Sequence, residues 1–156
     1  MGSDTILDME KEIQASEIRG VAECARLSSI EVCECQASID KKRLGLLGGK
    51  LDLDISTDVI LEAVEDKRFL VKVVAKISQK TVEDEESAPF KLNVNWNLVY
   101  DIVKPCDKKA IHGFVTAHTL FHAWPFIRET VHSLSGRMGI TNLLLPLLII
   151  GGKKPD

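Results

Sequence analysis

The sequence predicts an α+β fold: a four-stranded antiparallel sheet with a long kinked helix and an apolar C-terminal segment on one face. Three features predict this fold. Apolar and polar residues alternate in four runs between residues 29 and 102, which is typical of strands with one buried face. A helical repeat with an internal proline follows, in "FHAWPFIRETVHSLSGRMG" (121–139). The apolar run "LLLPLLII" (143–150) comes almost directly after it.

The bulk composition predicts one soluble domain spanning residues 1–156. The chain is 45% hydrophobic and 28% charged with a net charge of -3, so it lacks the basic excess of a nucleic-acid-binding protein. Its longest apolar run has eight residues, whereas a bilayer span needs about 20, and we expect no membrane insertion. The first residues do not resemble a signal peptide, and four cysteines are too few for a disulfide scaffold. We therefore expect a cytoplasmic protein.

The N-terminal part predicts a helix, a strand and a loop. Apolar residues at helical spacing predict a helix over 5–17, within a helical extension formed by residues 1–20. Alternation then predicts a strand over 29–40. The segment "KKRLGLLGGK" (41–50) contains three glycines, which disfavour regular structure, and we expect a mobile loop. This loop carries Leu44, Leu46 and Leu47.

Three further strands complete the predicted sheet. They are expected in "KLDLDIS" (50–56), over 69–78 and over 90–102, where apolar side chains point one way and polar ones the other. An acidic connection (81–89) separates the last two strands. Strands with this pattern belong to an antiparallel sheet that has one buried and one solvated face.

The last large element is a long helix. Asp107 is placed to cap its N-terminus, Pro125 predicts a kink near Phe121, and Gly139 can end it in a left-handed conformation. A seam at coiled-coil spacing consists of Leu120, Trp124, Ile127, Val131, Leu134 and Met138. Phe114, Phe121 and Phe126 lie off this seam, so the helix is apolar on more than one side. Self-association would bury the second side.

Three strings in this order resemble the SecB family of protein-export chaperones: "KLDLD" (50–54), "FHAWPFIRETVHSLSGRMG" (121–139) and "LLLPLL" (143–148). The resemblance covers roughly residues 24–148, and a short polar tail (151–156) follows. It implies a homo-oligomer, a dimer of dimers, that holds unfolded or aggregation-prone polypeptides in apolar grooves. It implies no catalytic residue and no cofactor. Family members hand preproteins to the SecA motor or protect an antitoxin, and both kinds of client stay open.

The resemblance and the apolar patterning together predict two groups of site residues. We expect polypeptide binding by Leu44, Leu46, Leu47, Leu51, Leu53, Leu144, Leu145 and Leu148. We expect the oligomer interface to contain Leu120, Trp124, Ile127, Val131 and Leu134.

Two other functions compete with this interpretation. A small α+β module could enclose an apolar ligand between sheet and helix. A metal- or thiol-dependent enzyme could use Cys33 and Cys35 with His118 and His122. We favour buried cysteines, because free cysteine is among the most buried residue types, and helix-surface or interface histidines, because the H-E-x-x-H glutamate is replaced by Thr119. We therefore expect no metal site and no enzymatic activity.

Overall fold

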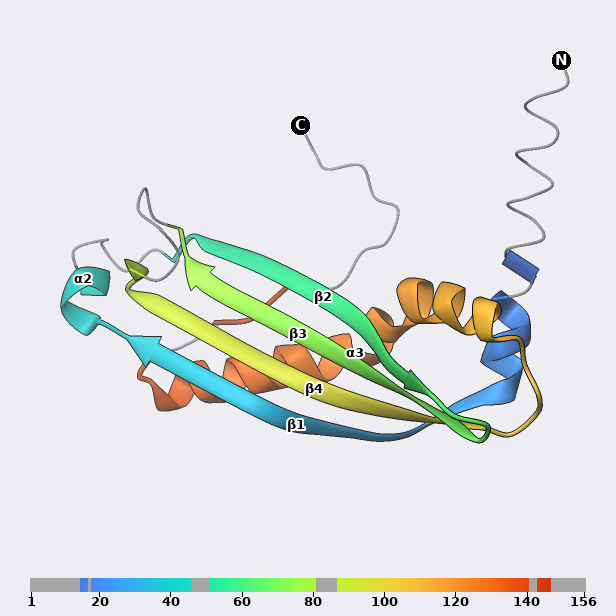
Figure 1. The fold of residues 1–156 in the computed structure, drawn as a ribbon. Helices are drawn as coiled ribbons and strands as arrows, with labels where there is room; N and C mark the ends of the chain where they lie inside the picture. The colour runs from blue at the N-terminus through green and yellow to red at the C-terminus, as the bar shows by residue number, and fades with distance from the viewer. Residues whose placement is uncertain (1–14, 17, 46–50, 81–86, 141–142, 147–156) are drawn as a thin grey trace, which may run out of the picture.

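The protein forms one antiparallel sheet with a long helix against one of its faces (Figure 1). The computed structural model describes residues 15–16, 18–45, 51–80, 87–140 and 143–146. The strand order is β1-β4-β3-β2. The elements are β1 (Ala25–Ile39), α2 (Lys41–Gly45), β2 (Leu53–Val64), β3 (Arg68–Gln79), β4 (Phe90–Ile102) and α3 (Lys108–Arg137). The predicted fold class is thus confirmed.

The hydrophobic core lies between α3 and the two central strands. Every second side chain of β3 and β4 is buried, from Phe69 to Ile77 and from Phe90 to Tyr100. We call this side of the sheet the inner face. Because burial of apolar surface is worth about 25 cal/mol per Å², this layer is the main source of stability.

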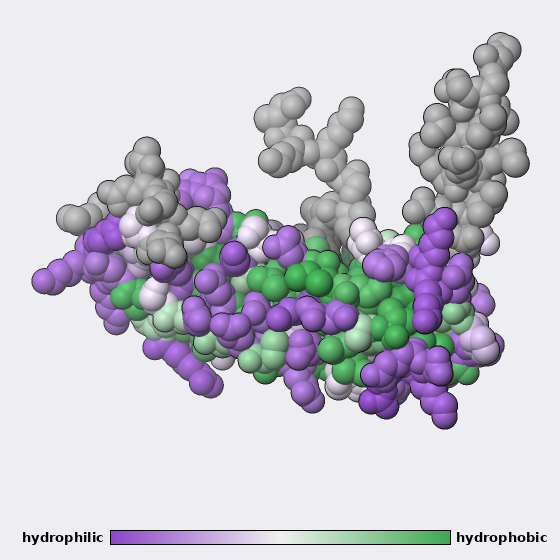
Figure 2. Space-filling model, viewed as in Figure 1, coloured by the Kyte–Doolittle hydropathy of each residue, from purple (hydrophilic) through white to green (hydrophobic). Residues whose placement is uncertain are grey.

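The outer face of the sheet is less uniformly polar than its β4 sequence predicts. Lys91, Asn93, Asn95 and Asn97 do lie on it, as expected. Figure 2 views the molecule from this side and shows a hydrophobic band among the hydrophilic side chains. The cross-strand register places five apolar residues on this face: Ile60, Ala63, Leu70, Val74 and Val99.

The edge strands are longer than predicted, and the first helix ends later. β2 runs on to Val64, eight residues beyond the predicted end, and β1 starts directly after a helical stretch at 18–24. The predicted helix over 5–17 lies almost wholly outside the described residues. Ile18 packs on α3 so closely that a Cβ added at Gly113 would lie 3.1 Å from Ile18 Cγ1. A glycine is what permits this contact.

A short helix replaces the first part of the predicted loop over 41–50. The carboxylate of Asp40 accepts hydrogen bonds from the backbone N–H groups of Lys42 (3.1 Å) and Arg43 (3.2 Å), which caps α2. The Arg43 guanidinium also donates to the carbonyl of Ser87, just before β4. The loop prediction is therefore wrong for residues 41–45. Residues 46–50 lie outside the described part, as do 81–86 of the acidic connection.

The long helix α3 starts and ends as predicted. Asp107 caps it by accepting a hydrogen bond from the N–H of Lys109 at 3.1 Å, and Gly139 follows it with φ of 83°. The helix continues through Pro125, which lies on its exposed side. Its ribbon is bent along its length in Figure 1.

Candidate functional site

The most prominent surface feature is apolar area that α3 leaves uncovered. Eight large hydrophobic side chains are exposed in the described part of the chain: Leu27, Val32, Ile55, Ile60, Val103, Phe121, Phe126 and Leu144. The register places Leu27 and Val32 on the inner face of β1 and Ile55 on that of β2. The uncovered area therefore flanks α3 on both edge strands.

The inner face of β1 is the clearest case. Val32 pairs directly with Trp96 of β4, yet Val32 is 51% exposed and Trp96 only 2%. Since directly paired residues of antiparallel strands point to the same face, both belong to one apolar surface that α3 covers only in part. We call the uncovered part the β1 margin. It consists of Leu27, Ile30, Val32, Cys35 and Ala37.

The predicted interface seam of α3 faces the protein's own sheet. Trp124, Ile127 and Val131 are buried within the single chain, and Leu120 and Leu134 are half-buried. The seam has this orientation because the inner face of the sheet is the nearest apolar surface that the helix can cover. Little of its area is left for another subunit.

Of the three phenylalanines predicted to form a second apolar side of α3, two are exposed. Phe121 and Phe126 are 41% and 44% exposed, whereas Phe114 is buried. Phe114 packs edge-on against Phe69 and Tyr100, with ring centroids 6.1 and 5.6 Å apart. A partner on this side of α3 would therefore meet Phe121 and Phe126.

The predicted polypeptide-binding leucines occupy different environments. Leu44 on α2, Leu51 and Leu53 are half-buried against the core, and Leu145 is buried. Leu144 is 61% exposed. Leu46, Leu47 and Leu148 lie outside the described residues. Leu44, Leu51, Leu53 and Leu145 therefore all contact the hydrophobic core, whereas Leu144 points to the surface.

Residues 143–146 form an extended segment on the α3 side of the sheet, which we call the strap (Figure 1). Three side chains of α3 bind its backbone carbonyls. Trp124 Nε1 donates to Pro146 at 3.0 Å, and Arg128 Nε donates to Leu145 at 2.9 Å. His132 Nδ1 lies 3.2 Å from the carbonyl of Leu143. We call these three side chains the α3 ladder.

The charged groups beside Leu51 and Leu53 form exposed ion pairs. Lys80 bridges Asp52 at 3.2 Å, and its ammonium is 4.0 Å from Asp54. Exposed pairs of this kind contribute about 0–1 kcal/mol. The ammonium of Lys41 lies beside Gly139, just after the C-terminus of α3. Its positive charge interacts favourably there with the negative end of the α3 dipole.

A small polar cluster lies over Tyr100. Its hydroxyl is 2.8 Å from Nδ1 of His122, within hydrogen-bond distance. Burial raises the pKa of Tyr100 to about 12, although the neighbouring Thr119 hydroxyl lowers it. Burial also lowers the pKa of His122, and the nearby His118 lowers it further. A neutral imidazole beside a protonated phenol fits an inert structural contact.

Cys33 and Cys35 do not face each other. A bulge lies between Val32 and Glu34, and Cys33 Sγ lies 3.6 Å from Asn97 Oδ1 on the outer face. Cys35 pairs with Val94 on the inner face. The two thiols therefore point to opposite faces, and both residues are exposed, so the predicted burial is wrong for the single chain. Among the described residues, no three or more His, Cys, Asp or Glu side chains come together as a metal site would require.

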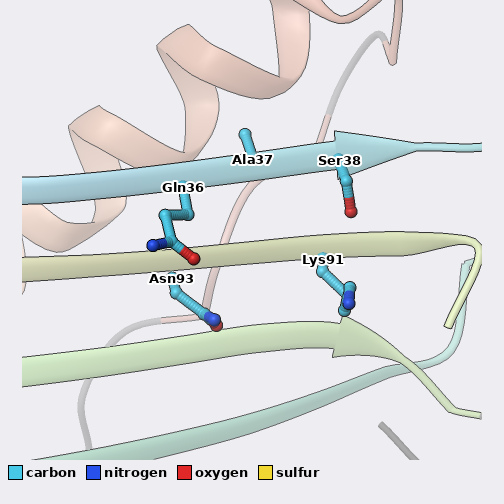
Figure 3. Close-up of a pocket in the computed structure, with 5 residues that line it drawn as sticks. All are labelled: Gln36, Ala37, Ser38, Lys91 and Asn93. Atoms are coloured by element: carbon cyan, nitrogen blue, oxygen red, sulfur yellow. The ribbon is translucent and has the colours of Figure 1, made fainter. Parts of the chain in front are cut away.

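A pocket of about 230 Å³ opens on the outer face near the end of β1 (Figure 3). Gln36, Ser38, Lys91 and Asn93 line it with Ala37, and Figure 3 shows that they come from the neighbouring strands β1 and β4. An enclosed apolar cavity was expected for a small-ligand module. This pocket is instead open and mostly polar in its lining side chains.

The β1 margin and the α3 ladder were not predicted from the sequence. A signal for the margin was present, because β1 shows apolar alternation while one helix can cover only about 10 Å of sheet width. The ladder had a weaker signal in the i, i+4, i+8 spacing of Trp124, Arg128 and His132. The sequence predicts that the apolar C-terminal segment lies on the same face as the helix, but not that these three side chains bind its backbone.

A search of solved structures identifies the same fold in the SecB-like chaperone Rv1957 of Mycobacterium tuberculosis, solved in complex with a ChAD peptide from the HigA1 antitoxin Rv1956. This match has a TM-score of 0.70 and 17% identity, and covers 86% of this chain and 98% of that one. A protein of unknown function from Streptococcus agalactiae matches with a TM-score of 0.46 and 8% identity, over 79% of this chain and 97% of that one.

No protein-family model and no curated protein matches the sequence. The likeness to Rv1957 is therefore one of fold. In the described part of the chain, no helix has both the length and the apolar character that a membrane crossing requires.

Proposed function

We propose that this protein is a SecB-like chaperone, a holdase that binds unfolded or aggregation-prone polypeptides without catalysing a reaction. The observation that carries the proposal is the apolar area left uncovered on both sides of α3, on a fold shared with a SecB-like chaperone. Monomeric soluble proteins rarely expose large contiguous apolar patches unless these bind something.

Client binding is assigned to the leucines that were predicted for it from the sequence. Leu44, Leu51 and Leu53 are half-buried, so each can bury further area against a client. Complete burial of one aliphatic side chain is worth about 1.5–3 kcal/mol. Several such contacts together bind an extended chain, and they do not require a particular client sequence. Leu46, Leu47 and Leu148 remain part of this proposal, while Leu144 and Leu145 take part through the strap, on which they lie.

A second copy of the chain is assigned to the β1 margin and to the exposed side of α3. Val32 and Leu27 on the strand and Phe121 and Phe126 on the helix are the residues with most area to bury. The half-buried seam residues Leu120 and Leu134 remain interface candidates. The proposed assembly is a homotetramer in the cytoplasm.

The proposed client is a dedicated polypeptide such as an antitoxin, with preproteins handed to SecA as the other candidate. The antitoxin ranks first because the SecB-like chaperone Rv1957, which shares this fold, was solved with an antitoxin peptide bound. The neighbouring genes distinguish the two. A toxin and antitoxin pair supports a dedicated client, and export genes support preproteins.

An aggregation-suppression assay tests the holdase function directly. A chemically denatured model protein is diluted into buffer with and without this chain, and light scattering is followed. Replacing Leu44, Leu46 and Leu47 together with serine should weaken the suppression and leave the oligomer intact. Ile60→Ser, at an exposed apolar position on the outer face, is the matched control. Scattering that the wild-type protein does not reduce would reject the proposal.

A further inference from the structure

The α3 ladder binds an extended main chain and no side chain. All three acceptors are carbonyl oxygens, at Pro146, Leu145 and Leu143. The donors lie four residues apart along one side of the helix, and the strap runs antiparallel to them, since the carbonyl numbers fall as the helix numbers rise. Because a carbonyl only accepts, Nδ1 of His132 must carry its proton here.

The side chains of the strap alternate between core and solvent. Leu143 and Leu145 are buried in the hydrophobic core, whereas Leu144 between them is exposed. An extended chain has this two-residue period, so every second side chain enters the core. The site thus accepts a stretch of extended polypeptide with apolar residues at alternate positions, whatever the residues between them.

We propose that the α3 ladder is a docking site for such a stretch of non-native polypeptide, and that the strap occupies it in cis until a client displaces it. The inference deepens the proposed holdase function and rests on it. The strap shows the chemistry of the client: extended backbone carbonyls for the ladder, and an aliphatic side chain at every second position for the core.

A strap tethered to the same chain is a strong competitor. Its effective concentration is of the order of mM, because it belongs to the same chain. A client binds only the fraction of molecules whose strap is released, so its apparent Kd is the intrinsic Kd divided by that fraction. Polar or short segments therefore fail to displace the strap, and longer apolar segments succeed. This sets a threshold that native protein surfaces do not reach.

The test measures binding of a labelled peptide to the full-length protein by fluorescence anisotropy. The probe carries the sequence NLLLPL of residues 142–147 between lysine pairs that keep it soluble. Leu145→Ser removes the most buried strap side chain. The Leu145→Ser protein should bind the probe at least about tenfold more tightly than the wild-type protein does. Burial of one leucine stabilises the docked strap by an amount equivalent to about a tenfold change in affinity or more. Ile60→Ser, the outer-face control, should bind as wild type does.

Equal affinity of Leu145→Ser and wild type for the probe, or no binding by either, would overturn the inference. Hydrogen exchange on the wild-type protein gives an independent result that does not depend on a variant. Saturating probe should speed exchange of the amide hydrogens of residues 143–145. Unchanged exchange with the probe bound would mean that the peptide binds elsewhere, and this also overturns the inference.

The same samples separate this inference from the proposed function. If Leu145→Ser gains affinity for the probe but neither protein suppresses aggregation, the docking site stands and the holdase proposal fails. If both proteins suppress aggregation equally and the probe never speeds exchange in the strap, the holdase proposal stands and the cis competition is wrong.

Discussion

Strands β1 and β4 are direct neighbours with the same inward pattern of side chains, yet only β4 is covered. Trp96 and Tyr100 on β4 are buried, while their partners Val32 and Leu27 on β1 are exposed. The difference arises from the width of one helix, which packs toward β2 and β3 and leaves β1, the far edge of the four-stranded sheet, open. The sequence pattern of a strand therefore predicts which of its faces is apolar. Whether that face is buried within the single chain depends on the element that packs against it.

The two edges also differ from each other. On the β1 side, the described residues contain no segment that covers the margin. At the other edge α3 itself contacts β2, and the strap adds Leu143 and Leu145 to the core. We assign the permanently open margin to a sister subunit and the strap-covered site to exchangeable clients, because an exchangeable site needs an occupant that can leave.

The largest expected effect is a difference in stability between substitutions at the cross-strand partners Trp96, which is buried, and Val32, which is exposed. Trp96→Ala should lower the free energy of unfolding by about 3–5 kcal/mol, because it leaves a cavity beneath α3. Val32→Ala should change it by no more than about 0.5 kcal/mol in the separated chain. Denaturant unfolding of both variants, at a low protein concentration that disfavours assembly, measures the contrast. Similar losses for both would mean that Val32 is not at an open margin.

Val32→Asp should instead affect assembly. A carboxylate buried against a second apolar surface is costly, so self-association should weaken at least about tenfold while the circular dichroism spectrum stays unchanged. Sedimentation velocity over a concentration series measures this. Ile60→Asp, also an exposed apolar position but on the outer face, is the control and should assemble as wild type does. If only the control dissociated, the interface would lie on the outer face.

A smaller effect is expected in the rates at which the thiols of the inner and outer faces of β1 are alkylated. Both Cys33 and Cys35 are exposed in the single chain, but they point to the outer and inner faces respectively. Assembly through the β1 margin should slow the reaction of Cys35 with iodoacetamide several-fold and leave Cys33 reactive. Peptide mass spectrometry after brief labelling, at low and high protein concentration, gives the two rates. Protection of Cys33 alone would contradict the proposed margin.

The pH dependence of stability should show the smallest effect. His122 contacts Tyr100, the covered partner of exposed Leu27, and its pKa is lowered chiefly by burial. The unfolded chain therefore binds more protons than the folded one as the pH falls below about 6.5, and stability falls with it. The melting temperature should decrease between about pH 7.5 and about pH 5.5.

His122→Gln should flatten that dependence. His112→Gln, an exposed position on the same helix, should retain it. A melting temperature of His122→Gln that falls with pH as steeply as that of the wild type would show that other groups cause the loss.

The local sequence pattern predicted those elements whose faces or ends are marked by residues within the element itself. The period-two run over 90–102 and the caps at Asp107 and Gly139 predicted β4 and the ends of α3 correctly. β2 was predicted too short because the polar Thr57 takes an inner-face position and the apolar Ile60 an outer-face position, so the apolar and polar alternation is lost after Ser56. The bulge at Cys33 sent Cys33 and Cys35 to opposite faces, although their spacing predicted one face.

The site depends on tertiary contacts that no local pattern encodes. The apolar seam of α3 was recognised, but its period fits either a sister helix or the chain's own sheet, and the sheet covers it. The apolar run after α3 was recognised as well. That Trp124 and Arg128 would bind its backbone depends on where the chain turns after Gly139.

One measurement tests the central claim that the inner face carries more apolar area than one chain covers: light scattering during size exclusion, with and without a chemically unfolded client. We predict a free particle whose mass is a multiple of the 17.3 kDa chain, and co-elution with the client when it is present. A particle of 17.3 kDa that elutes unchanged beside an aggregating client would contradict the account.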